Sequence, residues 1–217
     1  NGPYVAIGKT VSSKGKDVFL VESLSSKAYP EIRRALAHMI AQCKFLWDVD
    51  IINRVHGDLE GGLRGCIQDL NELGIAATFT QGYDPAANGA AEVAVGIISN
   101  MARARLAPFI DRNFGEETIK ALWPAACVHA AFSINAHKAN PSKARIQSVD
   151  ILPFGSMVTV NRRPLEGVHK TDLKTYDSIY LHPCSYTPRG HVVVPLGKIN
   201  DETSADKALY EVRNAIV

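Results

Sequence analysis

Two carboxylates in this sequence stand in surroundings that suit divalent-metal chemistry. Asp58 ends the run NRVHGD at residues 53–58, and Glu92 ends the run PAANGAAE at residues 85–92, a turn that opens into a helix. Hard cations such as Mg²⁺ are held by a few carboxylates, with the remaining positions left to water and substrate phosphate. Two such ions about 4 Å apart can activate an attacking oxygen and stabilise a leaving one. The pattern therefore indicates metal-dependent phosphoryl transfer.

These carboxylates must come from separate elements that converge. Apolar periodicity and turn residues predict a strand at 50–56, a short helix at 63–73, a short strand at 76–81 and a long helix at 89–107. On the long helix we expect one apolar stripe, widened by two neighbours; its members are Val93, Ile97, Met101 and Ala104, with Val95 and Ile98 beside them. A hairpin at 4–23, a helix at 29–45 and a helix at 116–135 complete this part of the chain.

The segment from Arg54 to Leu106 resembles the catalytic core of retroelement integrases, in particular copia-type and dinoflagellate-like retrotransposon integrases. In that family a strand ends in His-x-Asp, as at residues 56–58. A Pro-x-x-Asn-Gly-x-x-Glu turn then opens the helix that carries the catalytic Glu, as at residues 85–92. The resemblance implies an RNase H-like mixed α/β sheet flanked by helices. It also implies that Asp58 and Glu92 are catalytic ligands of Mg²⁺ or Mn²⁺.

Two departures from the family pattern concern activity. The family uses a third carboxylate, an Asp two residues before a Gly-Pro pair; here that pair is Gly2-Pro3, so the Asp is expected one residue upstream of Asn1, and the first strand is expected to be incomplete. A basic residue usually follows the Glu by one or two helical turns, where this chain has Gly96 and Ser99.

Two function classes therefore stay open. The preferred hypothesis is an integrase-derived fold that is catalytically inactive as given and is reused as a binding or structural subunit of a larger assembly. The alternative is an active retrotransposon integrase, in which the upstream Asp completes the metal site and a DNA 3′-hydroxyl attacks a phosphodiester. An active integrase would function as a homo-oligomer in the nucleus, whereas a reused subunit would belong to an organellar or cytoplasmic assembly.

The chain is expected to divide into three parts. Residues 1–148 form the integrase-like core, residues 149–199 form a small β-rich module, and residues 200–217 form a C-terminal helical tail. The module resembles the small β unit that follows the core in copia-type polyproteins, and five strands in a barrel-like arrangement are expected. The tail would carry Leu209, Val212 and Ile216 on one helical face.

Basic residues form two groups that suit contacts with the nucleic-acid backbone. Arg103 and Arg105 lie on the predicted long helix. The second group lies in a loop of the β module and consists of Arg162, Arg163, His169, Lys170 and Lys174. A solvated or protein-contacting face is the alternative interpretation of both groups.

Composition limits the remaining possibilities. The net charge of +2 lacks the positive excess of a strongly basic nucleic-acid binder, which leaves protein subunits as expected partners and nucleic acid as a further one. The four cysteines form no Cys-x-x-Cys pair, which is typical of reduced thiols in an intracellular compartment. The sequence predicts no membrane span and no signal peptide. Because the chain begins with Asn1, we expect a fragment or a processed product.

Overall fold

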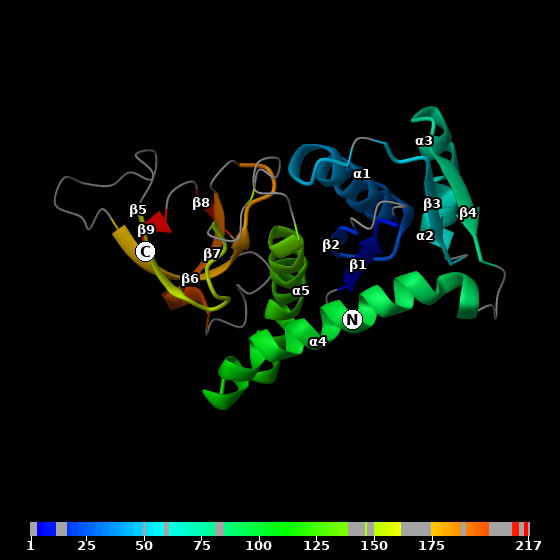
Figure 1. The fold of residues 1–217 in the computed structure, drawn as a ribbon. Helices are drawn as coiled ribbons and strands as arrows, with labels where there is room; N and C mark the ends of the chain where they lie inside the picture. The colour runs from blue at the N-terminus through cyan, green and yellow to red at the C-terminus, as the bar shows by residue number, and fades with distance from the viewer. Residues whose placement is uncertain are drawn as a thin grey trace.

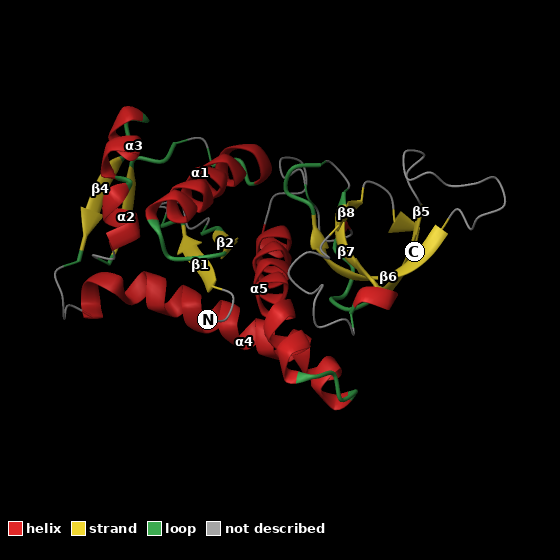
Figure 2. Cartoon of the chain, turned by 180° about the vertical axis from the view of Figure 1, so that it is seen from behind, coloured by secondary structure: helices red, strands yellow, loops and turns green. Residues whose placement is uncertain are grey.

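The computed structural model is a mixed α/β structure with two groups of strands, and one long helix, α5 (Glu116–Lys138), lies between them (Figures 1 and 2). The N-terminal strands and their helices lie on one side of helix α5, and the C-terminal strands lie on the other. The structure describes residues 4–11, 17–49, 51–58, 61–80, 85–138, 146, 150–161, 175–187, 190–199, 210–212 and 215–216.

The first two strands form the predicted hairpin. β1 (Tyr4–Lys9) and β2 (Phe19–Leu24) are antiparallel, with Lys9 opposite Phe19. At Phe19 the outward-facing backbone groups of β2 bond to a side chain from a distant helix. The Asn135 Oδ1 atom accepts a hydrogen bond from Phe19 N at 2.8 Å, and Asn135 Nδ2 donates to Phe19 O at 2.6 Å. A single buried amide thus satisfies backbone groups that a neighbouring strand would otherwise pair.

Helix α1 (Tyr29–Leu46) covers this hairpin. Pro30 lies in its first turn, where a missing N–H costs nothing. The helix buries Met39, Cys43 and Leu46 in one hydrophobic cluster with Leu20 of β2. The predicted helix at 29–45 is confirmed within one residue.

The next unit is a parallel strand pair with its crossover. β3 (Arg54–Gly57) pairs with β4 (Ala76–Phe79), and the short helices α2 (Gly61–Gly65) and α3 (Ile67–Glu72) connect them. Parallel strands need such a crossover because they cannot be joined by a tight turn. The carboxyl ends of both strands therefore lie at the same edge. Asp58 follows β3 at this edge, as predicted.

The described strands of the N-terminal part do not join into one mixed sheet. β1 and β2 form one two-stranded sheet, and β3 and β4 form another. The structure therefore contains the antiparallel and the parallel pairing that a mixed sheet requires. No strand among the described residues bonds to both pairs, so these residues do not confirm the single RNase H-like sheet predicted from the sequence.

Helices α4 (Pro85–Asp111) and α5 (Glu116–Lys138) pack against each other at the centre of the molecule (Figure 1). The predicted stripe of α4 is confirmed at Met101 and at its neighbour Ile98, which lie in or against the core, and is wrong at Val93 and Ile97. Val93 is 56% exposed and Ile97 is 38% exposed, whereas Ala94 and Ile98 are fully buried. The buried face continues through Ala102, Leu106 and Phe109. Alanines on this face, and on the facing side of α5, allow the two helix backbones to approach closely, which favours this face over the one with larger side chains.

The C-terminal strands form one antiparallel sheet in the order β8-β7-β6-β5-β9. Its three longer strands come from the predicted module: β5 (Met157–Asn161), β6 (Thr175–Pro183) and β7 (His191–Pro195). The helical tail predicted for residues 200–217 is wrong over the described residues. β8 (Tyr210–Val212) pairs with β7 and β9 (Ala215–Ile216) pairs with β5. Tyr210, Val212 and Ile216 have high β-strand propensity, and the outer edges of β5 and β7 were available to pair with these strands.

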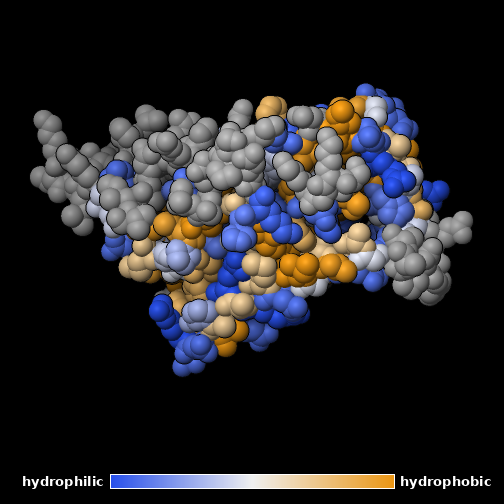
Figure 3. Space-filling model, in the orientation of Figure 1, coloured by the Kyte–Doolittle hydropathy of each residue, from blue (hydrophilic) through white to orange (hydrophobic). Residues whose placement is uncertain are grey.

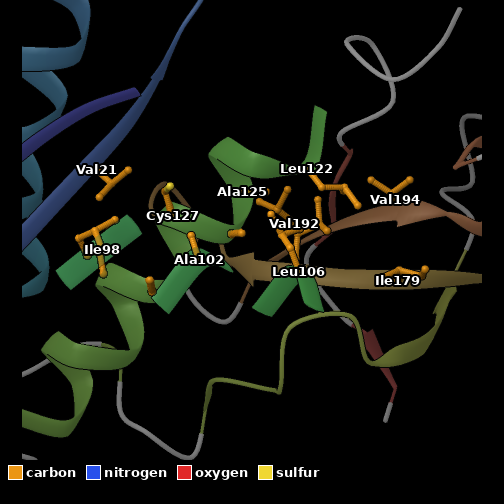
Figure 4. Packing of buried hydrophobic residues seen from close by; sticks show 14 of the residues in the cluster. Val21, Ile98, Ala102, Leu106, Leu122, Ala125, Cys127, Ile179, Val192 and Val194 are labelled. Atoms are coloured by element: carbon orange, nitrogen blue, oxygen red, sulfur yellow. The ribbon is translucent and has the colours of Figure 1, made fainter. Parts of the chain in front are cut away.

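A single hydrophobic core crosses the predicted boundary at residue 148. It includes Val21 of β2, Ile98 of α4, Leu122 of α5, and Ile179 and Val192 of the C-terminal sheet (Figure 4). Both groups of strands therefore pack against helix α5. Within the part of the chain that the structure describes, one segment, Asn88–Asp111 of α4, is long and apolar enough to cross a membrane by length and composition. Core helices pass the same test, and this helix buries one face against α5.

Candidate functional site

The edge where β3 and β4 end carries the first candidate carboxylate. Asp58 directly follows β3 and its side chain is exposed. Thr80 directly follows β4. The backbone N–H of Thr80 donates to Gly57 O at 2.9 Å, so the two strand ends are held together at the residue before Asp58.

A side chain from α4 joins this edge. Asn88 Nδ2 donates to Thr80 Oγ1 at 3.1 Å, and Thr80 Oγ1 lies 3.5 Å from Gly57 O. The first turn of α4 is therefore fixed against the strand ends. Glu92 lies four residues after Asn88, one turn further along the same helix face, and is exposed. Hydrogen bonds thus link Gly57 to Thr80 and Thr80 to Asn88. Together they connect the backbone beside Asp58 with the helix turn before Glu92.

Asn88 was not identified as a site residue from the sequence. Its Oδ1 atom is buried and makes no hydrogen bond within the described part of the protein. A buried amide oxygen without a donor is a costly arrangement, which a cation or a bound donor at this edge would relieve. The signal for Asn88 was present in the sequence, because it is the Asn of the Pro-x-x-Asn-Gly-x-x-Glu run.

The candidate metal ligands are all oxygen atoms. The carboxylates of Asp58 and Glu92 and the amide oxygen of Asn88 are the hard ligands that Mg²⁺ and Mn²⁺ prefer. Among the residues described, no group of three or more His, Cys, Asp or Glu side chains gathers closely enough to hold a metal ion. The chemistry of these donors suits Mg²⁺, and both the separation of the two carboxylates and the metal site itself stay predictions.

The two arginines of the predicted phosphate footprint have different environments. Arg103 is exposed, and its Nη1 donates to Asn100 Oδ1 at 2.9 Å on the same helix. Arg105 is half-buried, its Nε donates to His129 Nδ1 at 2.7 Å, and its Nη1 donates to Met101 O at 3.0 Å. Burial lowers the pKa of Arg105. The internal bonds of Arg105 leave Arg103 as the one of the two that is placed to meet a ligand from solvent.

The other predicted phosphate contacts lie outside the described residues. They are Arg162, Arg163, His169, Lys170 and Lys174. Their role as nucleic-acid contacts stays a prediction.

His129 is a structural residue at the junction of three segments. Its Nδ1 accepts from Arg105 of α4, and its Nε2 lies 2.8 Å from the carbonyl oxygen of Leu152, to which it donates. Its ring packs edge-on against Phe154 and Tyr180. Burial lowers the pKa of His129 to about 4, so the imidazole is neutral, as its acceptance from a guanidinium requires.

The cysteines give no sign of reactivity. All four are buried and unpaired with one another. Burial raises the pKa of Cys43 and of Cys127 to about 12, which keeps both as thiols. They function as small core side chains.

No protein-family model matches the chain, and no curated protein matches it. Among solved structures it is similar to a chain of the simian T-cell lymphotropic virus intasome in complex with PP2A regulatory subunit B56 gamma. That match has a TM-score of 0.42 and 12% identity, and it covers 97% of this chain and 74% of the other. The catalytic core domain of BIV integrase matches with a TM-score of 0.34 and 18% identity, over 64% of this chain and 86% of that one. At these identities and TM-scores the matches do not assign a family or a function to the chain.

Proposed function

We propose that this chain is an integrase-derived protein in which Asp58 and Glu92 occupy two carboxylate positions of a polynucleotidyl transferase site. In this proposal the 217 residues bind a divalent ion weakly and do not transfer DNA strands by themselves, and they serve as a binding or structural subunit of a larger assembly. The observation that carries the proposal is the chain of contacts from Gly57 through Thr80 to Asn88, because it links the residue before Asp58 to the helix turn before Glu92.

The metal part of the proposal follows from the donor set. When bound, a pair of Mg²⁺ or Mn²⁺ ions would activate the attacking oxygen and stabilise the leaving oxygen of a phosphodiester. The carboxylates of Asp58 and Glu92 would hold such an ion, and Asn88 Oδ1 would supply a neutral oxygen. Two carboxylates give a lower negative charge than three, so binding by this set is expected to be weak.

The subunit part of the proposal is supported by the outer face of α4. Three apolar side chains next to Glu92 are exposed: Val93 at 56%, Val95 at 45% and Ile97 at 38%. Figure 3 shows hydrophobic surface interspersed with hydrophilic surface on the side of the molecule seen in Figure 1. Val93 and Ile97, four residues apart, lie on one helix face, and exposed apolar residues of this kind suit a protein partner. The small net charge of +2 makes a protein partner at least as suitable as nucleic acid.

The second candidate function is an active integrase whose first catalytic Asp lies upstream of Asn1. The strand pairing favours it. Within the described residues β1 bonds only to β2 and β3 bonds only to β4, so each pair has an edge that a further strand could join. In this alternative, a further strand that ends in the first Asp would join one of these edges and would add the third carboxylate to the metal site.

Titration of the purified chain with Mn²⁺, followed by electron paramagnetic resonance, tests the site. We expect one weak site that is lost in Asp58→Asn and in Glu92→Gln. Asp111→Asn, at the far end of α4, is the matched control and should bind as the wild type does. Equal Mn²⁺ binding by all four proteins would contradict the proposal.

A nicking and strand-transfer assay separates the two candidates. We expect no activity from the 217-residue chain with Mg²⁺ or Mn²⁺. Activity that disappears in Glu92→Gln would replace the subunit hypothesis with the active integrase. A DNA affinity that falls steeply with salt would likewise favour the DNA-handling alternative.

A further inference from the structure

A second group of reactive side chains lies where α1 meets the turn after β6. It is built from elements that do not contribute to the Asp58 and Glu92 edge: Glu22 comes from β2, His38 from α1, and Ser185 from the residues that follow β6. The group therefore joins the N-terminal core to the C-terminal sheet.

The three side chains form a relay from a hydroxyl to a carboxylate. Ser185 Oγ lies 3.2 Å from His38 Nε2, and His38 Nδ1 lies 2.5 Å from Glu22 Oε1. With the imidazole proton on Nδ1, the serine hydroxyl donates to Nε2 and Nδ1–H donates to the carboxylate. This is the order of nucleophile, base and orienting acid that activates a serine. A distance of 3.2 Å between nucleophile and base is usual for a site without substrate.

Neighbouring residues fix the carboxylate and the imidazole. Glu22 is only 7% exposed, and its Oε1 also accepts from Gln42 Nε2 at 2.7 Å. The ring of Tyr186 stacks on the ring of His38 with centroids 4.2 Å apart and an angle of 6° between the planes. These contacts fix the orientation of the imidazole, so that Nδ1 faces the buried carboxylate of Glu22 and Nε2 faces Ser185.

A cavity of about 320 Å³ adjoins the relay. His38, Gln42 and Ser185 line it on the polar side. Phe45 and Leu46 of α1 and Pro183 of β6 are among its apolar lining residues. A cavity of this size, mostly apolar with a few converging polar groups, suits a small organic ligand.

We propose that Ser185, His38 and Glu22 form an acyl-transfer site for small carboxylic esters with an apolar acyl group. Ser185 Oγ attacks the ester carbon while His38 Nε2 takes the hydroxyl proton. The carbon–oxygen bond to the leaving alcohol breaks, and His38 returns the proton to that alcohol. Water then attacks the acyl-serine, again through His38, and releases the carboxylic acid. Glu22 is a positioning residue, because it acts on the substrate only through the imidazole.

The neighbouring nucleophile does not compete with this assignment. Cys184 is 4% exposed and packs in the central hydrophobic core. Ser185 is half-buried beside the cavity, which leaves it reachable by a small ester.

A fluorophosphonate probe tests the site in the folded chain, with the labelled peptide identified by mass spectrometry. We expect covalent labelling of Ser185 that is lost on heat denaturation and in His38→Gln. Ser156→Ala and His137→Gln, which change a half-buried serine and an exposed histidine outside the relay, are controls and should label as the wild type does. Absence of label on Ser185 in the folded wild type would refute the proposal without any variant.

Hydrolysis of p-nitrophenyl acetate and butyrate tests the role of each member. Ser185→Ala should reduce the rate to that of the buffer. Glu22→Gln should lower kcat by roughly 10²- to 10⁴-fold with KM unchanged, because the orienting carboxylate is lost while the cavity is kept. Glu22→Asp should restore part of kcat. If the three residues form only a polar joint between the two halves, Glu22→Gln and the wild type would hydrolyse the esters equally, and the proposal would be overturned.

Discussion

His129 makes the stability of this fold depend on pH, and the dependence can be isolated by one substitution. The imidazole accepts from the half-buried guanidinium of Arg105 and donates to Leu152 O, so it joins α4 and α5 to the segment before β5. Protonation of Nδ1 would end its role as acceptor and place a second positive charge against Arg105. Burial and this neighbouring cation lower the pKa of His129 from 6.5 to about 4.

The magnitude follows from that pKa. Between pH 6.5 and pH 4 the unfolded chain binds a proton at this imidazole and the folded chain does not, so the free energy of unfolding falls as the pH falls. The full stability is present above about pH 6.5, and about 3 kcal/mol is lost by about pH 4, with a slope of up to about 1.4 kcal/mol per pH unit. Other titrating groups also make the free energy of unfolding depend on pH. They are present in both the wild type and a single variant, so their contribution cancels in the difference between the two proteins.

Urea unfolding of the wild type and of His129→Gln at pH 7, 6, 5 and 4 measures the effect. Glutamine keeps an acceptor and a donor but does not titrate, so the stability difference between the two proteins should shift by about 3 kcal/mol in favour of the variant from pH 7 to pH 4. His137→Gln, an exposed position on the same helix, is the matched control substitution. If the free energies of unfolding of the wild type and of His129→Gln change in parallel with pH, the conclusion that His129 is buried and neutral is refuted.

Three further predictions concern the core. Asn135→Ala should cost about 3 kcal/mol in urea unfolding, because it leaves two buried backbone groups of Phe19 without a partner, whereas exposed Asn100→Ala should cost little. Ile98→Ala should lower the free energy of unfolding by about 3 kcal/mol, and Ile97→Ala by less than about 1 kcal/mol. A larger loss for Ile97→Ala in thermal melts would support the apolar stripe predicted from the sequence instead. The four buried thiols should react with a disulfide reagent only on unfolding, and fast reaction of the native chain would contradict their burial.

Local signals in the sequence were enough to predict most elements of the N-terminal part. Pro30 at the start of α1 and the acidic residues Glu116 and Glu117 at the start of α5 are helix signals that need no tertiary information. Asp58 after β3 and Glu92 on α4 were placed correctly on their elements for the same reason.

Tertiary packing decided what the sequence could not. A helix with apolar residues on several sides has more than one possible buried face, and α4 buries Ala94 and Ile98 because α5 offers small residues opposite them. The tail was predicted as a helix from Val212 and Ile216 at helical spacing, yet the open edges of β5 and β7 pair with it as strands.

Contacts between residues that are far apart in the chain could not be predicted from the sequence either. Nothing local indicates that Asn88 reaches Thr80, or that Arg105 turns to His129 instead of to solvent. The relay of Glu22, His38 and Ser185 likewise exists only because the C-terminal sheet docks beside α1.

Iron-directed cleavage measures most directly whether Asp58 and Glu92 share one metal site. Fe²⁺ replaces Mg²⁺ in oxygen-ligand sites, and with ascorbate and peroxide it generates hydroxyl radicals that cut the backbone beside the bound ion. We predict cuts near residue 58 and near residue 92 in the same preparation, both suppressed by excess Mg²⁺ and both lost in either Asp58→Asn or Glu92→Gln. Cuts at only one of the two positions, or cuts near residue 58 that persist in Glu92→Gln, would contradict a shared site.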